Sequence, residues 1–197
     1  MAFDYFHSLS KKNQRIYQAS DAVRTVELPV EALPGLQAIA ARLQPVLAGD
    51  KRLQVSKIVN ELVSALCAAL QIQPVQVVVR NVRPSSHAGE LHGLYTRHSD
   101  GRCKIEVWMR TAQQARVVAY RTFLRTLLHE VGHHLDYVHF KFGDSFHCEG
   151  FFRRESDLVR KLAAPTAPRS RKKASDAAPP RAAKPARPAP PQLSFGF

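Results

Sequence analysis

Cysteine is scarce in this chain of 197 residues, which contains only Cys67, Cys103 and Cys148 and has no C-x-x-C pair. An odd, widely spaced set of this kind indicates free thiols in a reducing compartment. Long apolar runs are also missing, since none reaches the roughly 18 residues that a membrane span requires. The N-terminus lacks the apolar stretch of a secretory signal. These absences predict a cytoplasmic protein with no membrane partner.

Acidic residues are few, with 16 Asp and Glu against 29 Lys and Arg, so the formal net charge is +13. Such an excess of positive charge favours polyanionic partners, and nucleic acid first among them. A protein that is simply basic has the same composition, and charge alone does not separate the two possibilities.

Composition changes sharply near Leu162. Residues 163–197 are rich in proline, alanine and basic side chains, and such a segment cannot bury enough apolar surface to offset the entropy of ordering it. We therefore predict a disordered tail over 163–197. The residues before it are numerous enough for one hydrophobic core, and they divide into a helical part, 1–72, and a mixed part, 73–162.

Hydrophobic periodicity predicts helices, then strands, then helices again. The predicted helices span 16–26, 33–47, 55–72, 111–137 and 149–162, of which the fourth is expected to be interrupted early. The predicted strands span 75–82, 92–97 and 103–110. The turn signal SDG at 99–101 joins the last two strands into a hairpin. The sequence therefore predicts an α+β fold.

Apolar residues recur in three of these segments, and in the first of them they form a stripe that fits a core face. In 55–72 they recur every four residues at Ile58, Leu62, Leu66 and Leu70. In 103–110 they alternate with other residues at Ile105, Val107 and Met109. In 149–162 they are Phe152, Leu158 and Leu162.

The stretch LLHEVGHHLDY, residues 127–137, contains the pattern H-E-x-x-H. On a helix His129 and His133 lie about 40° apart around the axis, so both imidazoles can bind one ion, whereas Glu130 is offset by about 100°. Two imidazoles suit Zn²⁺, which lowers the pKa of a bound water to about 7. Glu130 is then placed to act as general base. An ordinary buried helix with incidental histidines would show the same pattern.

The third ligand is less constrained by the sequence. His139 follows His133 by six residues but lacks the glycine-directed turn of the longer motif. His147 follows Gly143, which can end the helix and let the chain fold back. Glu155 lies on the last predicted helix at a spacing that a returning helix allows. Spacing alone leaves His147 and Glu155 equal as candidates.

Asp136 lies seven residues after His129 and almost on the same helical face. It can accept a hydrogen bond from a ligand imidazole and fix its tautomer. A solvated aspartate is an equally good interpretation of this position.

With both motifs in hand, LLHEVGHHLDY followed by SFHCEGFFRRESDL resembles the small bacterial zincin-type metallopeptidase-like proteins and, more distantly, the SprT-like metalloproteases. Those proteins carry a third histidine shortly before an aromatic pair, here His147 with Phe151 and Phe152. The resemblance covers about 75–162. It implies a minimal zincin with a small sheet beside the motif helix and an edge strand near the substrate. It also favours His147 as the third ligand, and makes 73–162 the metal-binding core.

Two features depart from that family. No cysteine-rich zinc ribbon follows the core, and the helices predicted within 1–72 have no counterpart in it. Both departures weaken any transfer of substrate from the family to this chain.

The last six residues, QLSFGF (192–197), resemble the Q-L-x-L-x-F peptide that binds the bacterial sliding clamp, with Phe195 where leucine is usual. In such a peptide Leu193 and Phe197 enter an apolar groove and Gln192 bonds at its rim. The basic cluster RSRKK at 169–173 can contact DNA phosphates, although a solubilising tail is equally plausible.

Together these features predict a zinc-dependent metallopeptidase with His129, His133 and His147 as ligands and Glu130 as general base. Its substrate is a protein or peptide, with DNA-associated proteins as one class. Two alternatives remain: a zincin-fold binding or regulatory module without turnover, and a basic nucleic-acid-binding protein with a structural zinc.

Overall fold

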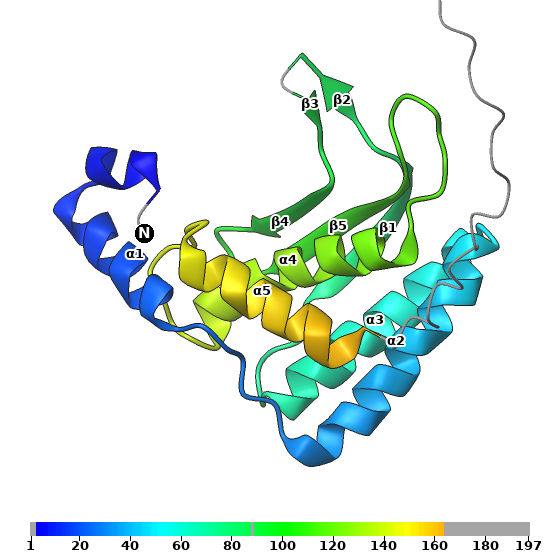
Figure 1. Ribbon diagram of the computed structural model, residues 1–197, viewed down its shortest axis with the longest axis horizontal. Coiled ribbons are helices and arrows are strands. Elements are labelled where there is room, and N and C mark those ends of the chain that lie inside the picture. The colour runs from blue at the N-terminus through cyan, green and yellow to red at the C-terminus, as the bar shows by residue number, and fades with distance from the viewer. Residues whose placement is uncertain (1–2, 88, 164–197) are drawn as a thin grey trace, which may run out of the picture. The chain divides into compact units, whose positions relative to one another are not determined.

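Five α-helices and two small sheets make up the computed structural model, which describes residues 3–87 and 89–163 (Figure 1). These residues belong to one compact unit, Met1–Pro165. The predicted α+β class is therefore confirmed. None of the described helices combines the length and the apolar character that crossing a membrane demands. The predictions for the tail, including Gln192, Leu193 and Phe197, fall outside the described residues.

The elements alternate much as the periodicity predicts. The α-helices are α1 (Lys11–Ala22), α2 (Leu33–Ala48), α3 (Arg52–Ala69), α4 (Tyr120–Val138) and α5 (Glu149–Leu162). Short 3₁₀ helices are η1 (Asp4–Ser8) and η2 (Val30–Ala32). The strands are β1 (Gln76–Val82), β2 (Ser85–Ser86), β3 (Gly89–Glu90), β4 (Gly93–Arg97) and β5 (Cys103–Arg110). The sequence did not predict β2 and β3, which pair with each other as a separate hairpin.

The main sheet has the strand order β1-β5-β4, with β5 parallel to β1 and antiparallel to β4. The predicted hairpin of β4 and β5 is confirmed, and β4 forms an edge of the sheet. Ile105, Val107 and Met109 are buried, but so are the alternate residues Glu106 and Trp108. Glu106 is shielded by ion pairs with Arg80 on β1 at 2.5 Å and with Lys104 at 2.9 Å, which accounts for its departure from simple alternation.

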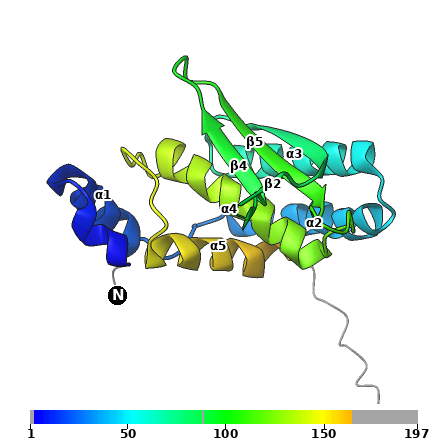
Figure 2. The same cartoon turned by 90° about the horizontal axis from the view of Figure 1, so that it is seen from above.

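The helices cover the sheet in layers. The helix α4 lies between the sheet and α5, while α3 packs on β1, and α2 packs on both α3 and α5 (Figures 1 and 2). The predicted core stripe of α3 is confirmed, because Ile58, Leu62, Leu66 and Leu70 are all buried in the central cluster. On α5 the buried aromatic residue is Phe151, whereas the adjacent Phe152 is 39% exposed.

Two helix boundaries differ from the predictions for local reasons. The first helix begins at Lys11, because the side chain of Ser10 accepts a hydrogen bond from the amide of Asn13. It ends at Ala22, and Val26 is extended and buried. The motif helix begins at Tyr120 rather than near 111, since residues after β5 turn back on the strand through an Arg110–Val117 bridge.

The chain reverses after α4 at Lys141, which has a φ of 57°. The amides of His139 and Phe140 both donate to the carbonyl of Leu135, so the helix closes before Gly143. The prediction that Gly143 ends this helix was therefore wrong. A lysine in the left-handed region makes the turn, and Gly143 has an ordinary φ in the returning segment.

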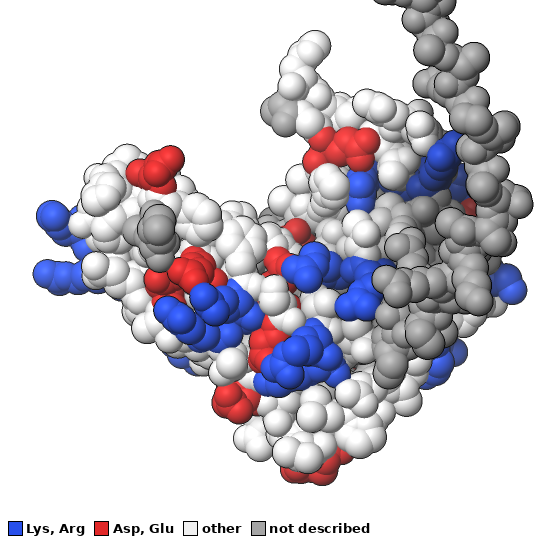
Figure 3. Space-filling model, in the orientation of Figure 1, with Lys and Arg blue, Asp and Glu red and all other residues white. Residues whose placement is uncertain are grey.

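Charges along α5 are paired rather than gathered by sign. Figure 3 shows acidic and basic side chains interspersed on this face. Glu149 pairs with Arg153 at 2.5 Å, and Asp157 pairs with Arg160 at 2.5 Å and with Lys161 at 2.7 Å.

The first turn of α5 lies directly against the end of α1. A Cβ at Gly150 would lie 2.5 Å from the carbonyl oxygen of Ser20 and 2.6 Å from that of Asp21. The amide of Gly150 donates to Asp21 Oδ1 at 2.8 Å. Only glycine therefore allows these two backbones to approach so closely.

We predict that Gly150→Ala lowers the free energy of unfolding by about 2 kcal/mol or more, because backbone atoms cannot yield to the added methyl. Urea denaturation of the full chain measures this change. Gly35→Ala is the matched control, since nothing lies within 4 Å of its Cβ, and alanine in a helix should be neutral or slightly stabilising. Equal stability of the two variants would contradict the close packing of α1 and α5.

Candidate metal centre

The helix α4 carries His129 and His133 at the margin of its buried face. The apolar side chains that fix this face in the core are Leu124, Leu127, Leu128, Val131 and Leu135. The two histidines are partly exposed, and their ring centroids are 5.1 Å apart. The apolar stripe thus positions both imidazoles at the rim of the core, where they face the segment that returns from α4 to α5.

His147 on that returning segment completes a group of three imidazoles. Its Nε2 lies 3.0 Å from Nε2 of His129 and 3.2 Å from Nε2 of His133. One ligand atom from each of the three lies within 4.8 Å of the others. Among the described residues no other histidine, cysteine or carboxylate joins this group. The structure brings together the three predicted ligands and places His139 and Glu155 outside them.

The other ring nitrogens of the two helical histidines are each held by an oxygen. Nδ1 of His129 lies 2.8 Å from Glu155 Oε2, and Glu155 also pairs with Arg125. Nδ1 of His133 lies 2.7 Å from Ser145 Oγ. Each Nδ1–H donates a hydrogen bond to an oxygen, so Nε2 is the unprotonated nitrogen of each ring. Its lone pair is therefore available at the centre of the group. Glu155 is therefore placed to orient a ligand rather than to be one.

Asp136 does not touch an imidazole. The hydroxyl of Ser145 donates to Asp136 Oδ2 at 2.7 Å and accepts a hydrogen bond from Nδ1 of His133. The other oxygen of Asp136 accepts from Arg154 at 2.8 Å. Of the two interpretations of this position, neither direct contact with a ligand ring nor a solvated aspartate is found, and the carboxylate acts on His133 through Ser145. The register of α4 points Asp136 into the core, where it is fully buried.

Glu130 lies in the same pocket, with 6% of its surface exposed. Its side chain lies against β4, where a Cβ at Gly93 would overlap Oε1 and come within 2.7 Å of Cγ. Burial raises the pKa of Glu130 to about 7, while His129 and a hydrogen bond with the backbone of Tyr95 act in the opposite direction. A carboxyl with a pKa near neutrality can both accept and release a proton.

The environment of His133 and of His147 favours the neutral form of each ring. Burial, followed by the neighbouring His129 and His147, lowers the pKa of His133 to about 3. Burial also lowers the pKa of His147. Neutral imidazole is the form that binds a metal, so these shifts favour the ligand state of both rings.

The donor set and its spacing fit Zn²⁺. A tetrahedral zinc with Zn–N bonds of 2.0–2.1 Å holds its nitrogens about 3.3 Å apart, which is close to the observed 3.0 and 3.2 Å. The site opens into a pocket of about 330 Å³ between β4 and α4. Three protein ligands beside an open pocket are the arrangement of a catalytic zinc, whereas structural sites are closed by four.

The aromatic residue that follows His147 by one helical turn packs against the motif helix. The ring centroid of Phe151 lies 4.9 Å from that of His129 and 4.8 Å from that of His133. A Cβ at Gly132 would come within 3.1 Å of the Phe151 ring. Because Gly132 has no side chain, the ring of Phe151 can pack against the rings of both His129 and His133.

Several supporting residues escaped the sequence analysis. Ser145 and Arg154 gave no local signal, since each acts through contacts with distant segments. Gly93 did give a local signal, because a glycine within a strand often marks the close approach of another group. Tyr5 donates its hydroxyl to the carbonyl of His147 at 3.0 Å, which places part of the N-terminal segment beside the third histidine.

Comparison with known proteins gives no match to any family model, curated protein or solved structure. The resemblance to zincins therefore rests on the two motifs and on the geometry of the site.

We predict that Ser145→Ala weakens zinc binding about 10- to 100-fold, because His133 loses the oxygen that fixes its tautomer. Competition with a zinc-specific chelator measures this affinity. Ser64→Ala on α3 is the control, since Ser64 is exposed and does not line the pocket that contains the histidines. An unchanged dissociation constant in Ser145→Ala would show that the bridge to Asp136 does not support the ligand.

Proposed function

We propose that this chain is a zinc-dependent peptidase. The observation that carries the proposal is the convergence of three imidazole Nε2 atoms, 3.0 and 3.2 Å apart, in one pocket with Glu130. His129, His133 and His147 would hold the ion. When bound, zinc would supply Lewis-acid chemistry, polarising the scissile carbonyl and making a water acidic.

Glu130 would act as general base and then as general acid. Its carboxylate would take the proton of the attacking water and deliver it to the amine of the departing peptide. Both steps need a group whose pKa lies near the working pH, and burial raises the pKa of Glu130 to about 7. Gly93 makes room for this carboxylate, because any side chain there would occupy its position.

The edge strand β4 offers a place for the substrate backbone. Within the described residues it pairs with β5 on one side only, and an extended peptide can add to such an edge by main-chain hydrogen bonds. Residues Gly93, Leu94 and Tyr95 line the pocket that contains the histidines. A peptide on this edge would pass beside Glu130.

The alternative of a structural zinc in a nucleic-acid-binding protein is less well supported, because the group has three protein ligands and borders a pocket. A binding module without turnover would share the metal site and is separated only by activity. The further suggestion that the substrate is bound to DNA depends on the net charge of +13 and on residues 163–197.

We predict that Glu130→Gln lowers kcat by at least about 1,000-fold while zinc remains near one ion per chain, because the amide cannot accept the proton. Cleavage of a peptide library and elemental analysis measure the two quantities. The control is Glu31→Gln, at an exposed position. Cleavage that survives Glu130→Gln would reject this mechanism, and no cleavage by the unaltered chain would favour the binding module.

Gly93→Ala tests the space that β4 provides for Glu130. We expect kcat/KM to fall about 100-fold with zinc content unchanged, because a displaced carboxylate no longer reaches the reacting water. Gly35→Ala again serves as control, since its Cβ would meet nothing within 4 Å. Normal activity in Gly93→Ala would mean that Glu130 works from another position.

A further inference from the structure

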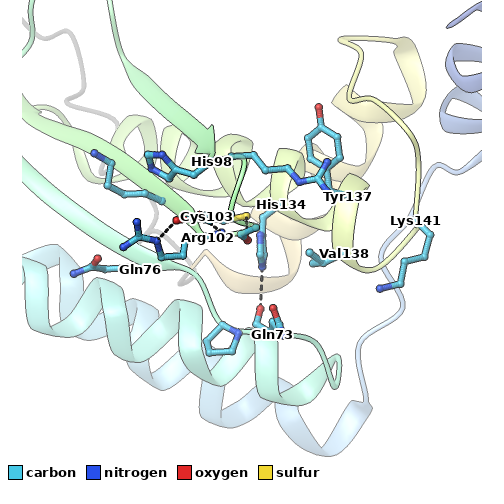
Figure 4. Close-up of a pocket in the computed structure, with 14 residues that line it drawn as sticks. Gln73, Gln76, His98, Arg102, Cys103, His134, Tyr137, Val138 and Lys141 are labelled. Atoms are coloured by element: carbon cyan, nitrogen blue, oxygen red, sulfur yellow. Dashed lines mark hydrogen bonds and ion pairs between the residues drawn. The ribbon is translucent and has the colours of Figure 1, made fainter.

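A second and larger pocket, of about 940 Å³, lies beside the candidate metal centre. Its lining residues come from the end of β4, the turn into β5, the segment before β1, and the end of α4 with the residues after it. Tyr137 lines both pockets, so they adjoin. Figure 4 shows Arg102 and Lys141 on opposite sides of this second pocket, with Gln73 and His134 between them.

Positive charge dominates this pocket. Its charged lining consists of one acid, Asp100, and four basic side chains, Arg97, Arg102, Lys104 and Lys141. Arg102 pairs with Asp100 at 2.7 Å, and Lys104 pairs with the nearby Glu106 at 2.9 Å.

The two remaining cations have no such compensation. Arg97 and Lys141 have no carboxylate partner among residues 3–87 and 89–163. The guanidinium of Arg97 lies over the ring of Tyr137, 5.0 Å from its centroid. This contact holds Arg97 at the boundary between the two pockets but leaves its charge unneutralised. The pocket therefore presents two free cations to a ligand.

The aromatic residues of the pocket are not arranged for nucleic-acid bases. Apart from histidines, Tyr137 is the one aromatic residue that lines it within the described part of the chain. Its ring is already engaged by Arg97 and by Tyr95, whose ring stacks on it at 6.0 Å. Single-stranded nucleic acid is usually held by aromatic faces on which bases stack. A ligand that offers carboxylates without bases fits this lining better.

The length of β4 sets the distance between Glu130 and the basic pocket. Gly93, at its first residue, meets Glu130, and Arg97, at its last, lines the basic pocket. At about 3.3 Å per residue these ends lie roughly 13 Å apart. An extended peptide beside β4 would thus bring a side chain about four residues from the scissile bond to Arg97.

We infer that the basic pocket binds the side-chain carboxylate of an acidic residue in the peptide substrate, about four residues from the bond that is cleaved. This inference rests on the proposed function, since it takes the position of Glu130 as the point of cleavage. Arg97 and Lys141 are the specificity-determining residues, and neither belongs to the group that would hold zinc or transfer protons.

Binding of labelled peptides to the zinc-loaded full chain with Glu130→Gln tests the inference without cleavage. A single glutamate is moved along an otherwise neutral, C-terminally amidated peptide, and glutamine replaces it in the reference peptide. We expect binding about tenfold tighter at one position, since Arg97 and Lys141 are exposed and ion pairs with exposed side chains are individually weak. Arg97→Gln with Lys141→Gln should remove this preference and leave the affinity for the neutral peptide unchanged.

The control pair, Arg24→Gln with Lys57→Gln, makes the same change in net charge at exposed positions outside the pocket. It should leave the preference intact. Lys141→Gln alone repeats the test if the double variant does not fold, and should lose part of the preference.

Four results would overturn the inference. One is no difference between glutamate and glutamine at any position. Another is an equal gain at every position, lost equally in the control pair, which would reflect net charge alone. The third is displacement by single-stranded DNA that depends on Arg97 and Lys141 more strongly than peptide binding does. A preference that disappears with a free C-terminus in place of the amide would assign the pocket to terminal carboxylates instead.

Failure of the proposed function would look different. If the unaltered chain cleaves no peptide but the positional preference persists in binding, the pocket recognises carboxylates and the peptidase proposal falls. If peptides are cleaved without any acidic preference, the peptidase proposal stands and the pocket has another role.

Discussion

The buried ion pair between Arg154 and Asp136 joins three helices and reaches the candidate metal centre. Arg154 is 2% exposed and Asp136 is fully buried. Burying two charges is costly unless every remaining hydrogen-bonding group finds a partner. Here Arg154 also donates to the carbonyls of Ser20 and Val23 at 2.6 Å each, and Asp136 accepts from Ser145. The end of α1, the buried face of α4 and the middle of α5 are thus held by one guanidinium, and Ser145 extends this network to His133.

This network makes the N-terminal segment part of the site. Arg154 donates to the carbonyl of Ser20 at the end of α1, and the hydroxyl of Tyr5 donates to the carbonyl of His147. Residues within 1–72 therefore support a group of ligands that the motifs alone assign to 73–162. The division into a helical part and a metal-binding core describes the order of elements along the chain, but the geometry of the third histidine depends on both.

The sequence predicted what local pattern determines and missed what distant contacts determine. One helical turn separates His129 from His133, so the sequence predicted that they lie together. The alternation in 103–110 and the turn before it likewise predicted the β4–β5 hairpin. The start of α4 was missed because a bridge to β5 holds 111–119 out of the helix. Ser145 and Arg154 were missed because their roles depend on residues from other segments that fold against them. Phe151 and Phe152 are adjacent, and only the packing of α5 on α4 decides which is buried.

The way the histidines are held bears on whether a metal would serve structure or chemistry. Small zinc domains fold only with the ion, because they lack a core of their own. This chain has a continuous apolar core that includes α2, α3, the sheet, α4 and α5. Glu155 and Ser145 already fix the rings of His129 and His133 through Nδ1. The apolar core stabilises the fold, and Glu155 and Ser145 orient the rings, without any metal. The three converging imidazoles are therefore not needed to hold the fold together. Under the proposed function, the ion would act chemically at the open side of the group, where Glu130 lies.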